Sequence, residues 1–327
     1  LYKDYPYPHV EVTRQVLEQR GYSIKALADG VEQVAEFAVE QTEAGRPLLI
    51  VEDGGYIVPY LHEACPELLS HVIGAVEQTT KGKRNDEKIS ELRFPVLAVA
   101  ASEAKQVLES SHVGRAVVRN VERALPNERL AGKKSCLIGY GGIGEHIAQE
   151  LRNVKMDVVV WDEEPLRRAA AEEAGLQVAD SVTNAIADAW LVIGATGSTS
   201  VTETEINRFR HGSYLVSASS DWDEIDRHAL ENLSVERRAS SVGTRYKLRK
   251  VGNPEITLLA NGCPINFYRA DSLPNAVIDA VLSQLFVAAA EVMSGEQDLN
   301  NGVLTNEVNE LISKRKLVDR YMEFQRP

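Results

Sequence analysis

The sequence predicts an α/β protein of two domains, and three observations carry that prediction. The chain has 327 residues, a length typical of two domains. Short apolar runs that end in turn residues alternate with helical patterns, which is typical of parallel sheets covered by helices. The alternation occurs in two series, separated by a break at residues 125–128. We therefore expect one domain over 113–275 and a smaller α/β domain over 1–112 and 276–327, with the C-terminal helices packing back on it.

In the first series, each expected strand is an aliphatic, β-branched run followed by turn chemistry, as at Asp53-Gly54-Gly55. The helices between the strands carry apolar residues at helical spacing. Segment 80–91 is highly charged and contains Gly82, so we expect an exposed loop there. The expected strands are 48–52, 72–76 and 96–100, and the expected helices are 10–20, 31–43, 57–64 and 103–124.

The second series has the same alternation, with Pro165 at the favoured first turn of a helix. A long amphipathic helix and a charged helical tail follow it. The expected strands are 135–139, 157–162, 190–195, 214–218, 246–250, 256–260 and 265–268, and the expected helices are 143–153, 165–174, 275–293 and 306–325.

The charge balance excludes several classes of partner. The formal net charge of −12 argues against nucleic acid or an anionic membrane as a partner.

Three widely spaced cysteines, with no HxH or HExxH pattern, predict no metal site and reduced thiols, as in the cytoplasm. The aromatic, Pro-rich segment 1–9 does not resemble a secretory signal, and no apolar run reaches the roughly 18 residues of a membrane span.

The run Gly-Tyr-Gly-Gly-Ile-Gly at 139–144 has GxGxxG spacing, follows an apolar strand and opens a helix. Gly139 would permit the tight turn, Gly141 the approach of the backbone to a pyrophosphate, and Gly144 close helix–strand packing. The free N–H groups of the helix would face the phosphates. These features predict a Rossmann-type dinucleotide-binding domain in which the cofactor contacts Gly139, Gly141, Gly142, Ile143 and Gly144.

Asp162 ends the next strand, 18 residues after Gly144. A carboxylate there would accept hydrogen bonds from the adenosine ribose and repel a 2′-phosphate, so we expect NAD rather than NADP. The turn at Thr196-Gly197 ends another strand and either lies along the cofactor crevice or is a plain turn.

Residues 130–226 resemble the cofactor domain of the adenosylhomocysteinase family. The first unit resembles the same family more weakly. The stronger resemblance rests on Ala131-Gly132-Lys133, the glycine turn, Trp161-Asp162-Glu163-Glu164-Pro165, Ala195-Thr196-Gly197 and Asp223-Glu224-Ile225-Asp226. Leu259-Ala260-Asn261-Gly262 with Asn266 is similar to the family's later strand and turn. The weaker resemblance of the first unit rests on Val51-Glu52-Asp53-Gly54-Gly55 and Glu77-Gln78-Thr79-Thr80-Lys81-Gly82, and residues 8–17 and 105–115 match the family's catalytic helices.

In that family a tightly held NAD oxidises a ribose 3′-hydroxyl, which permits loss of a 5′ thiol and addition of water. The resemblance implies roles for residues here: Lys105 would take the hydroxyl proton, and His9 would lie near the leaving group. Asp53 matches the substrate-domain aspartate. The resemblance also places Thr79, Thr80 and Asn266 at the cofactor.

Departures from the family fall on the substrate side. Gln78 stands where the family has a glutamate that holds a ribose hydroxyl, and Ser220 and Leu273 stand where it has histidines. Glu109 and Ser110 replace an aspartate and an asparagine near the lysine. The stretch before the Asp53 turn is shorter than in the family, and the C-terminal Lys…Tyr segment is missing. A substrate other than adenosylhomocysteine is therefore expected, with Gln78 and Ser220 as substrate contacts.

Each catalytic candidate also has a plain structural interpretation. Lys105 is either the base or a solvated lysine, and Glu109, one helical turn later, either orients it or forms an ordinary exposed pair. Asp53 either acts in the site or caps its own turn, and His9 is either functional or a helix-start residue.

The functional hypothesis is an NAD-dependent enzyme that oxidises a ribose- or sugar-like hydroxyl of a small-molecule substrate, either as a net oxidation or as a transient step toward elimination, hydrolysis or epimerisation. A simple dehydrogenase of a small hydroxy acid and a non-catalytic NAD-binding regulator are the alternatives. By analogy with the family, the Ala-rich helix at 275–293 and the charged tail predict a homodimer or higher homo-oligomer.

Overall fold

The computed structural model describes residues 3, 5 and 7–324, without the side chains of residues 8, 9, 28 and 29. The chain divides into two compact units. Unit 1 comprises Leu1–Leu108 and Asn275–Pro327, and unit 2 comprises Glu109–Pro274. The division falls inside one helix, α5 (Glu103–Ala124). Strands alternate with helices in both units, which confirms the predicted α/β class.

The sheet of unit 1 contains parallel strands in the order β1-β2-β3-β12. Glu52 pairs with Glu77, and Glu77 pairs with Ala98, so the first three strands end level with one another. Residues that follow these strands therefore meet at one edge of the sheet. The strands are β1 (Leu48–Glu52), β2 (Val72–Glu77), β3 (Pro95–Ala98) and β12 (Gly302–Leu304).

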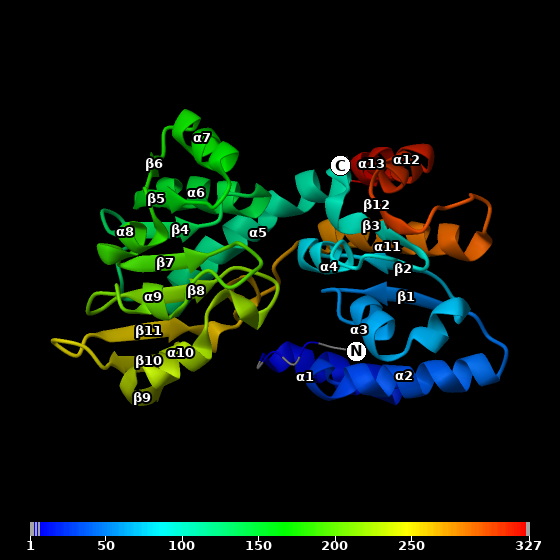
Figure 1. The fold of residues 1–327 in the computed structure, drawn as a ribbon. Helices are drawn as coiled ribbons and strands as arrows, with labels where there is room; N and C mark the ends of the chain where they lie inside the picture. Colours follow the sequence, from blue (N-terminus) through cyan, green and yellow to red (C-terminus); the bar gives the residue numbers. More distant parts are fainter. Residues whose placement is uncertain (1–2, 4, 6, 325–327) are drawn as a thin grey trace. The chain divides into compact units, whose positions relative to one another are not determined.

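Helices cover both faces of this sheet. Since successive side chains of a strand point to opposite faces, neighbouring strand residues pack against different helices. Ala75 packs in a hydrophobic cluster with α2 and α3, whereas Val76 packs in a second cluster with α11 and α12. The C-terminal helices thus pack on strands from the first third of the chain (Figure 1). The helices are α1 (Pro8–Gln19), α2 (Leu27–Glu43), α3 (Ile57–Ala64), α4 (Thr80–Asp86), α11 (Asn275–Ser294), α12 (Asn306–Lys314) and α13 (Leu317–Phe324).

Helix α11 is the one helix among the described residues that is long and apolar enough to cross a membrane by length and composition. It packs against β1 and β2, and its Leu285 and Ala288 are buried in the second cluster of unit 1. Its Phe286 and Met293 are exposed. Packing in the core of unit 1 thus accounts for part of its apolar composition.

The sheet of unit 2 has the strand order β6-β5-β4-β7-β8-β11-β10-β9. Its first six strands are parallel in the order 3-2-1-4-5-6 of a dinucleotide-binding fold, and an antiparallel hairpin extends the far edge. The strands are β4 (Lys134–Ile138), β5 (Asp157–Trp161), β6 (Gln177–Val178), β7 (Leu191–Gly194), β8 (Tyr214–Ser217), β9 (Ser234–Ser240), β10 (Gly243–Leu248) and β11 (Glu255–Leu259). The helices are α6 (Gly142–Asn153), α7 (Pro165–Glu173), α8 (Val182–Ala187), α9 (Glu203–Ile206) and α10 (Arg227–Asn232).

Three element predictions are wrong. The helix expected over 306–325 is broken into α12 and α13, because Lys316 between them has a left-handed φ of +53°. The expected loop at 80–91 begins with helix α4, because the Thr79 hydroxyl caps its first turn by accepting a hydrogen bond from the Gly82 N–H at 2.9 Å. The expected strand at 265–268 is a 3-10 turn, Ile265–Phe267. The carbonyls of Ile265 and Asn266 are held by the Asn120 side chain of α5 rather than by a neighbouring strand.

Candidate active site

The glycine turn of unit 2 follows β4, at the point where the strand order changes direction between β4 and β7. Gly139 has a φ of +98°, and a Cβ there would lie 2.7 Å from the Ala195 carbonyl oxygen. A Cβ on Gly144 would lie 2.1 Å from the Gly139 carbonyl oxygen. Only glycine permits this approach of helix to strand, which places the N-terminus of α6 at the ligand-binding position of the fold.

At Gly141 the protein itself leaves room for a side chain, so Gly141→Ala tests whether the cofactor requires glycine there. A Cβ there would meet only the Arg167 guanidinium, at 3.5 Å, and its φ of −77° suits alanine. We therefore expect an unchanged melting temperature and NAD binding weakened about tenfold or more, because the backbone can no longer approach the pyrophosphate. Calorimetric titration with NAD and a thermal melt measure the two effects.

The matched change is Gly144→Ala, which we expect to destabilise unit 2 itself because its Cβ would clash with backbone. An NAD affinity of Gly141→Ala equal to that of the wild type would contradict the assignment of this turn.

Asp162 lies directly after β5 and is 7% exposed. Its carboxylate accepts the N–H of Tyr140 at 2.6 Å and the N–H of Glu164 at 2.9 Å. The aspartate thus holds the glycine turn in shape. Each of its oxygens has a further lone pair, which would accept a hydrogen bond from a ribose hydroxyl, the role predicted for it.

Asn266 provides a second polar group that fits a cofactor. Its amide nitrogen donates to Ser272 Oγ at 3.0 Å. Its Oδ1 is buried and, within the described part of the chain, has no hydrogen-bond partner. A buried carbonyl oxygen without a donor is costly, and an amide N–H of a ligand would satisfy it. The glycine turn, Asp162 and this oxygen are groups that would hold a dinucleotide such as NAD.

A buried carboxylate anchors the turn that follows β7. Glu224 is fully buried and accepts the backbone N–H groups of Thr196 and Gly197 at 3.1 and 3.0 Å. The Thr196 and Ser200 hydroxyls also donate to it. Burial raises the pKa of Glu224 above its ordinary value, against these hydrogen bonds. The Glu224 carboxylate therefore fixes the backbone of the Thr196-Gly197 turn.

Three predicted residues of unit 1 follow three neighbouring strands. Asp53 follows β1, Gln78 follows β2, and Lys105 lies in the first turn of α5, after β3 and the short 3-10 turn Val99–Ala101. Because β1, β2 and β3 are parallel neighbours, their carboxyl ends share one edge of the sheet, where α/β proteins collect functional groups.

The immediate contacts of these residues differ. The Asp53 carboxylate is half exposed and forms an ion pair with Lys3 at 2.6 Å. Gln78 and Lys105 are half-buried. The backbone N–H of Lys105 donates to Ser102 Oγ at 3.1 Å. The first turn of α5 is therefore capped, and the backbone position of Lys105 is fixed.

The remaining predicted residues are more scattered. Thr79 is buried, and its hydroxyl donates to Glu77 Oε1 at 2.7 Å, whereas Thr80 is exposed. Glu109 lies half-buried one turn after Lys105 on α5, and Ser220 is exposed after β8. The side chain of His9, a predicted catalytic residue, lies outside the described residues.

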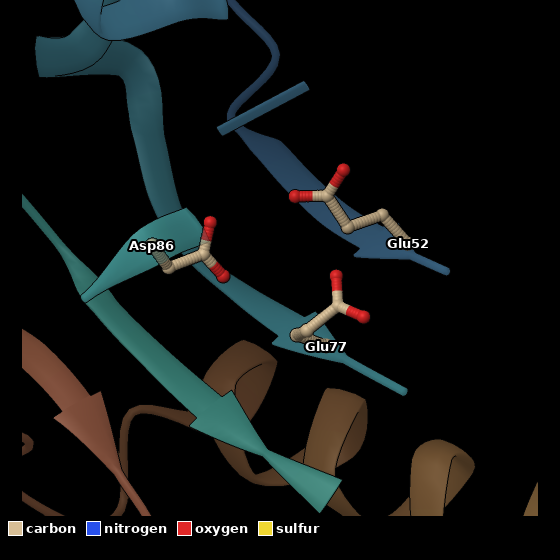
Figure 2. A group of neighbouring side chains, drawn as sticks. All are labelled: Glu52, Glu77 and Asp86. Atoms are coloured by element: carbon tan, nitrogen blue, oxygen red, sulfur yellow. The ribbon is translucent and has the colours of Figure 1, made fainter. Parts of the chain in front are cut away.

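Sequence reasoning missed a group of three carboxylates at the carboxyl edge of the unit 1 sheet, Glu52, Glu77 and Asp86 (Figure 2). One oxygen from each lies within 4.8 Å of the other two. Desolvation by burial raises the pKa of Glu77 to about 7 and that of Asp86 to about 8, and it also raises the pKa of Glu52. The available signal was that two neighbouring parallel strands each end in glutamate.

These raised pKa values predict a pH dependence of stability in cation-free buffer. As the pH rises from about 4 to 8, the unfolded chain releases protons from Glu77 and Asp86 before the folded chain does, so stability is lost over that window. The raised pKa of Glu77 alone corresponds to about 3 kcal/mol. Urea unfolding at pH 5 and pH 8 in EDTA measures the loss, and Asp86→Asn should flatten it. A pH-independent difference between the two proteins would contradict the prediction.

Comparison with known proteins identifies a family and several relatives of this chain. Residues 113–272 match the family model described as "S-adenosyl-L-homocysteine hydrolase, NAD binding domain". The adenosylhomocysteinase of Archaeoglobus fulgidus is 30% identical over 288 residues, covering 86% of this chain and 70% of the relative. The adenosylhomocysteinase of Sulfurisphaera tokodaii is 29% identical over 318 residues, covering 94% and 73%. The S-inosyl-L-homocysteine hydrolase of Methanothermobacter thermautotrophicus is 27% identical over 293 residues, covering 86% and 70%.

The matched domain contains the glycine turn, Asp162 and Asn266. The cofactor of the chain is therefore NAD, as the motif predicted. The similarity to the full-length relatives extends over unit 1 as well.

Proposed function

The chain belongs to the adenosylhomocysteinase family of NAD-dependent enzymes, and on that basis we propose that it oxidises a hydroxyl of a ribose- or sugar-like substrate other than adenosylhomocysteine. The oxidation would be a transient step that enables elimination, hydrolysis or epimerisation. The observation that carries the proposal is the position of Asp53, Gln78 and Lys105 after three neighbouring parallel strands.

The chain's own residues would divide the work as follows. The Lys105 amine would take the proton of the hydroxyl that is oxidised, since it lies at the sheet edge on a capped helix turn. The Asp53 carboxylate would orient a second hydroxyl, and Asp162 and Asn266 would hold the cofactor. Bound NAD would supply the acceptor for the hydride of the hydroxyl carbon and its return.

The case for a different substrate rests on Gln78. Its backbone N–H donates to the Glu52 carbonyl at 3.0 Å, so it is fixed at the end of β2. Where the family has a negatively charged acceptor, this position presents a neutral amide that both donates and accepts hydrogen bonds. Ser220 likewise offers a hydroxyl where the family has an imidazole. A site altered at two polar positions would favour a substrate with a different pattern of donors and acceptors.

The test is a substrate panel with purified holoenzyme: adenosylhomocysteine, S-inosylhomocysteine, a base-free ribosyl thioether and a free pentose. Absorbance at 340 nm reports enzyme-bound NADH, and a thiol reagent reports the leaving group. We expect kcat/KM for at least one other compound to exceed that for adenosylhomocysteine about tenfold. Gln78→Glu, which restores the family's carboxylate, should shift the preference toward adenosylhomocysteine.

Three results would count against the proposal. Adenosylhomocysteine as the best substrate would overturn the substrate assignment. Net accumulation of free NADH with a small hydroxy acid would favour a simple dehydrogenase. Stoichiometric NAD without turnover of any sugar-like hydroxyl would favour a regulatory protein.

A further inference from the structure

Asp86 is buried without any group to satisfy it. Its side chain is 0% exposed, and neither carboxylate oxygen has a hydrogen-bond partner among the described residues. It ends helix α4 and points toward Glu52 and Glu77; the Glu52 carboxyl group points back toward it, and the Glu77 carboxyl group points toward Glu52 (Figure 2). A bare buried carboxylate is among the most costly groups in a folded protein, so this position calls for a partner.

The two glutamates are built into the backbone around the same point. Glu77 accepts the N–H groups of Gly54, Gly55 and Thr79, and Glu52 accepts those of Tyr56 and Ile57 at the start of α3. A Cβ on Gly82 would lie 2.1 Å from the Glu77 carboxyl carbon, so α4 passes directly against it. The carboxylates are therefore fixed in place by the fold, unlike a cluster on an exposed loop.

We propose that Glu52, Glu77 and Asp86 bind one calcium-sized divalent cation. Three carboxylates form an all-oxygen donor set, which suits hard cations such as Ca²⁺, Mg²⁺ and Mn²⁺ rather than zinc or copper. The cation satisfies the two bare oxygens of Asp86 and offsets the mutual repulsion of the three buried charges. Burial, and after it the neighbouring carboxylates, raise the pKa values of Glu77 and Asp86 when no cation is present.

The spacing of the oxygens permits one shared ion. One oxygen from each carboxylate lies within 4.8 Å of the other two. Two oxygens on one ion can be no farther apart than twice the metal–oxygen distance, about 4.8 Å for Ca²⁺ and about 4.2 Å for Mg²⁺. Because Ca²⁺ accepts irregular coordination whereas Mg²⁺ demands a near-ideal octahedron, carboxylates fixed by the fold suit Ca²⁺ better.

The position of the site gives the cation a positioning role. Glu52 directly precedes Asp53, and Glu77 directly precedes Gln78. A cation that joins the two glutamates and Asp86 therefore ties together the ends of β1 and β2 and helix α4. Binding of the cation does not depend on the proposed reaction, because it is measured without turnover.

The experiment is a calorimetric titration of the full-length, EDTA-treated protein with CaCl₂, and separately with MnCl₂ and MgCl₂, paired with thermal melts. We expect one Ca²⁺ per chain and weaker binding of Mg²⁺. At a concentration 100 times the dissociation constant, Ca²⁺ should raise the melting temperature by about 5 °C. Asp86→Asn should weaken Ca²⁺ binding at least tenfold and remove the rise.

The matched control is Glu87→Gln, which neutralises the next residue, an exposed glutamate paired with Lys83. It should bind Ca²⁺ as the wild type does. Failure of the wild type to bind any of the three cations would overturn the proposal and leave the carboxylates holding protons instead. Equal binding by Asp86→Asn and wild type would also overturn it. If Asp86→Asn fails to fold, the stoichiometry measured on the wild type decides alone.

Discussion

Lys105→Met is expected to lower kcat about 10²–10⁴-fold, the range for loss of a general base. Methionine keeps most of the apolar stem but has no amine to take the proton of the reacting hydroxyl. The capping of α5 uses the backbone N–H of residue 105, so the helix start is unaffected. Single-turnover formation of enzyme-bound NADH, followed at 340 nm with the best substrate of the panel, measures the effect.

The control is Lys314→Met, which removes an exposed lysine of unit 1 on α12. It should retain the wild-type rate. The NAD content of Lys105→Met should equal that of the wild type, because the residues assigned to the cofactor lie on other elements. A rate within threefold of the wild type would remove Lys105 from the mechanism.

Glu224→Ala is expected to lower the free energy of unfolding by about 3–5 kcal/mol. The change leaves the N–H groups of Thr196 and Gly197 and the Ser200 hydroxyl without their acceptor, in a place where the replaced side chain was fully buried. Because the Thr196-Gly197 turn then loses its anchor, NAD affinity should fall as well. Denaturant unfolding and calorimetry with NAD measure the two losses.

Glu172→Ala is the matched control, since it removes an exposed glutamate of unit 2 on α7. It should change stability by less than about 0.5 kcal/mol. A Glu224→Ala protein as stable as this control would mean that water replaces the carboxylate without cost.

The sequence predicted the dinucleotide-binding unit well because its signals are local. A glycine turn, the strand before it and the acid at the end of the next strand lie within 29 consecutive residues, 134–162, and each has one physical reason. Short apolar runs such as Leu191–Gly194 are recognised as strands from their own composition, and this one is buried along its whole length. These features do not depend on distant contacts, so periodicity and turn chemistry suffice.

The missed features depend on strand pairing and packing that the apolar pattern of the sequence does not reveal. β9 (Ser234–Ser240) contains Glu236, Arg237 and Arg238, and it forms a strand because it pairs with β10 at the sheet edge, where charged side chains are exposed. The acidic group is likewise formed by β1, β2 and α4, and no spacing in the sequence brings Asp86 to Glu52. The segment around Asp86 is so charged that exposure was the natural expectation.

The pairing of β12 with β3 has a consequence for the order in which the protein forms during synthesis. Residues 302–304 pair with residues 95–97, about two hundred positions earlier, and residues 109–274 make up unit 2 between them. A ribosome delivers all of unit 2 before it delivers the last strand of unit 1. Unit 2 can therefore fold on the nascent chain, while the carboxyl edge with Asp53, Gln78 and Lys105 waits on an incomplete sheet with an open edge. Completion of the unit 1 sheet is thus tied to synthesis of the segment that follows unit 2.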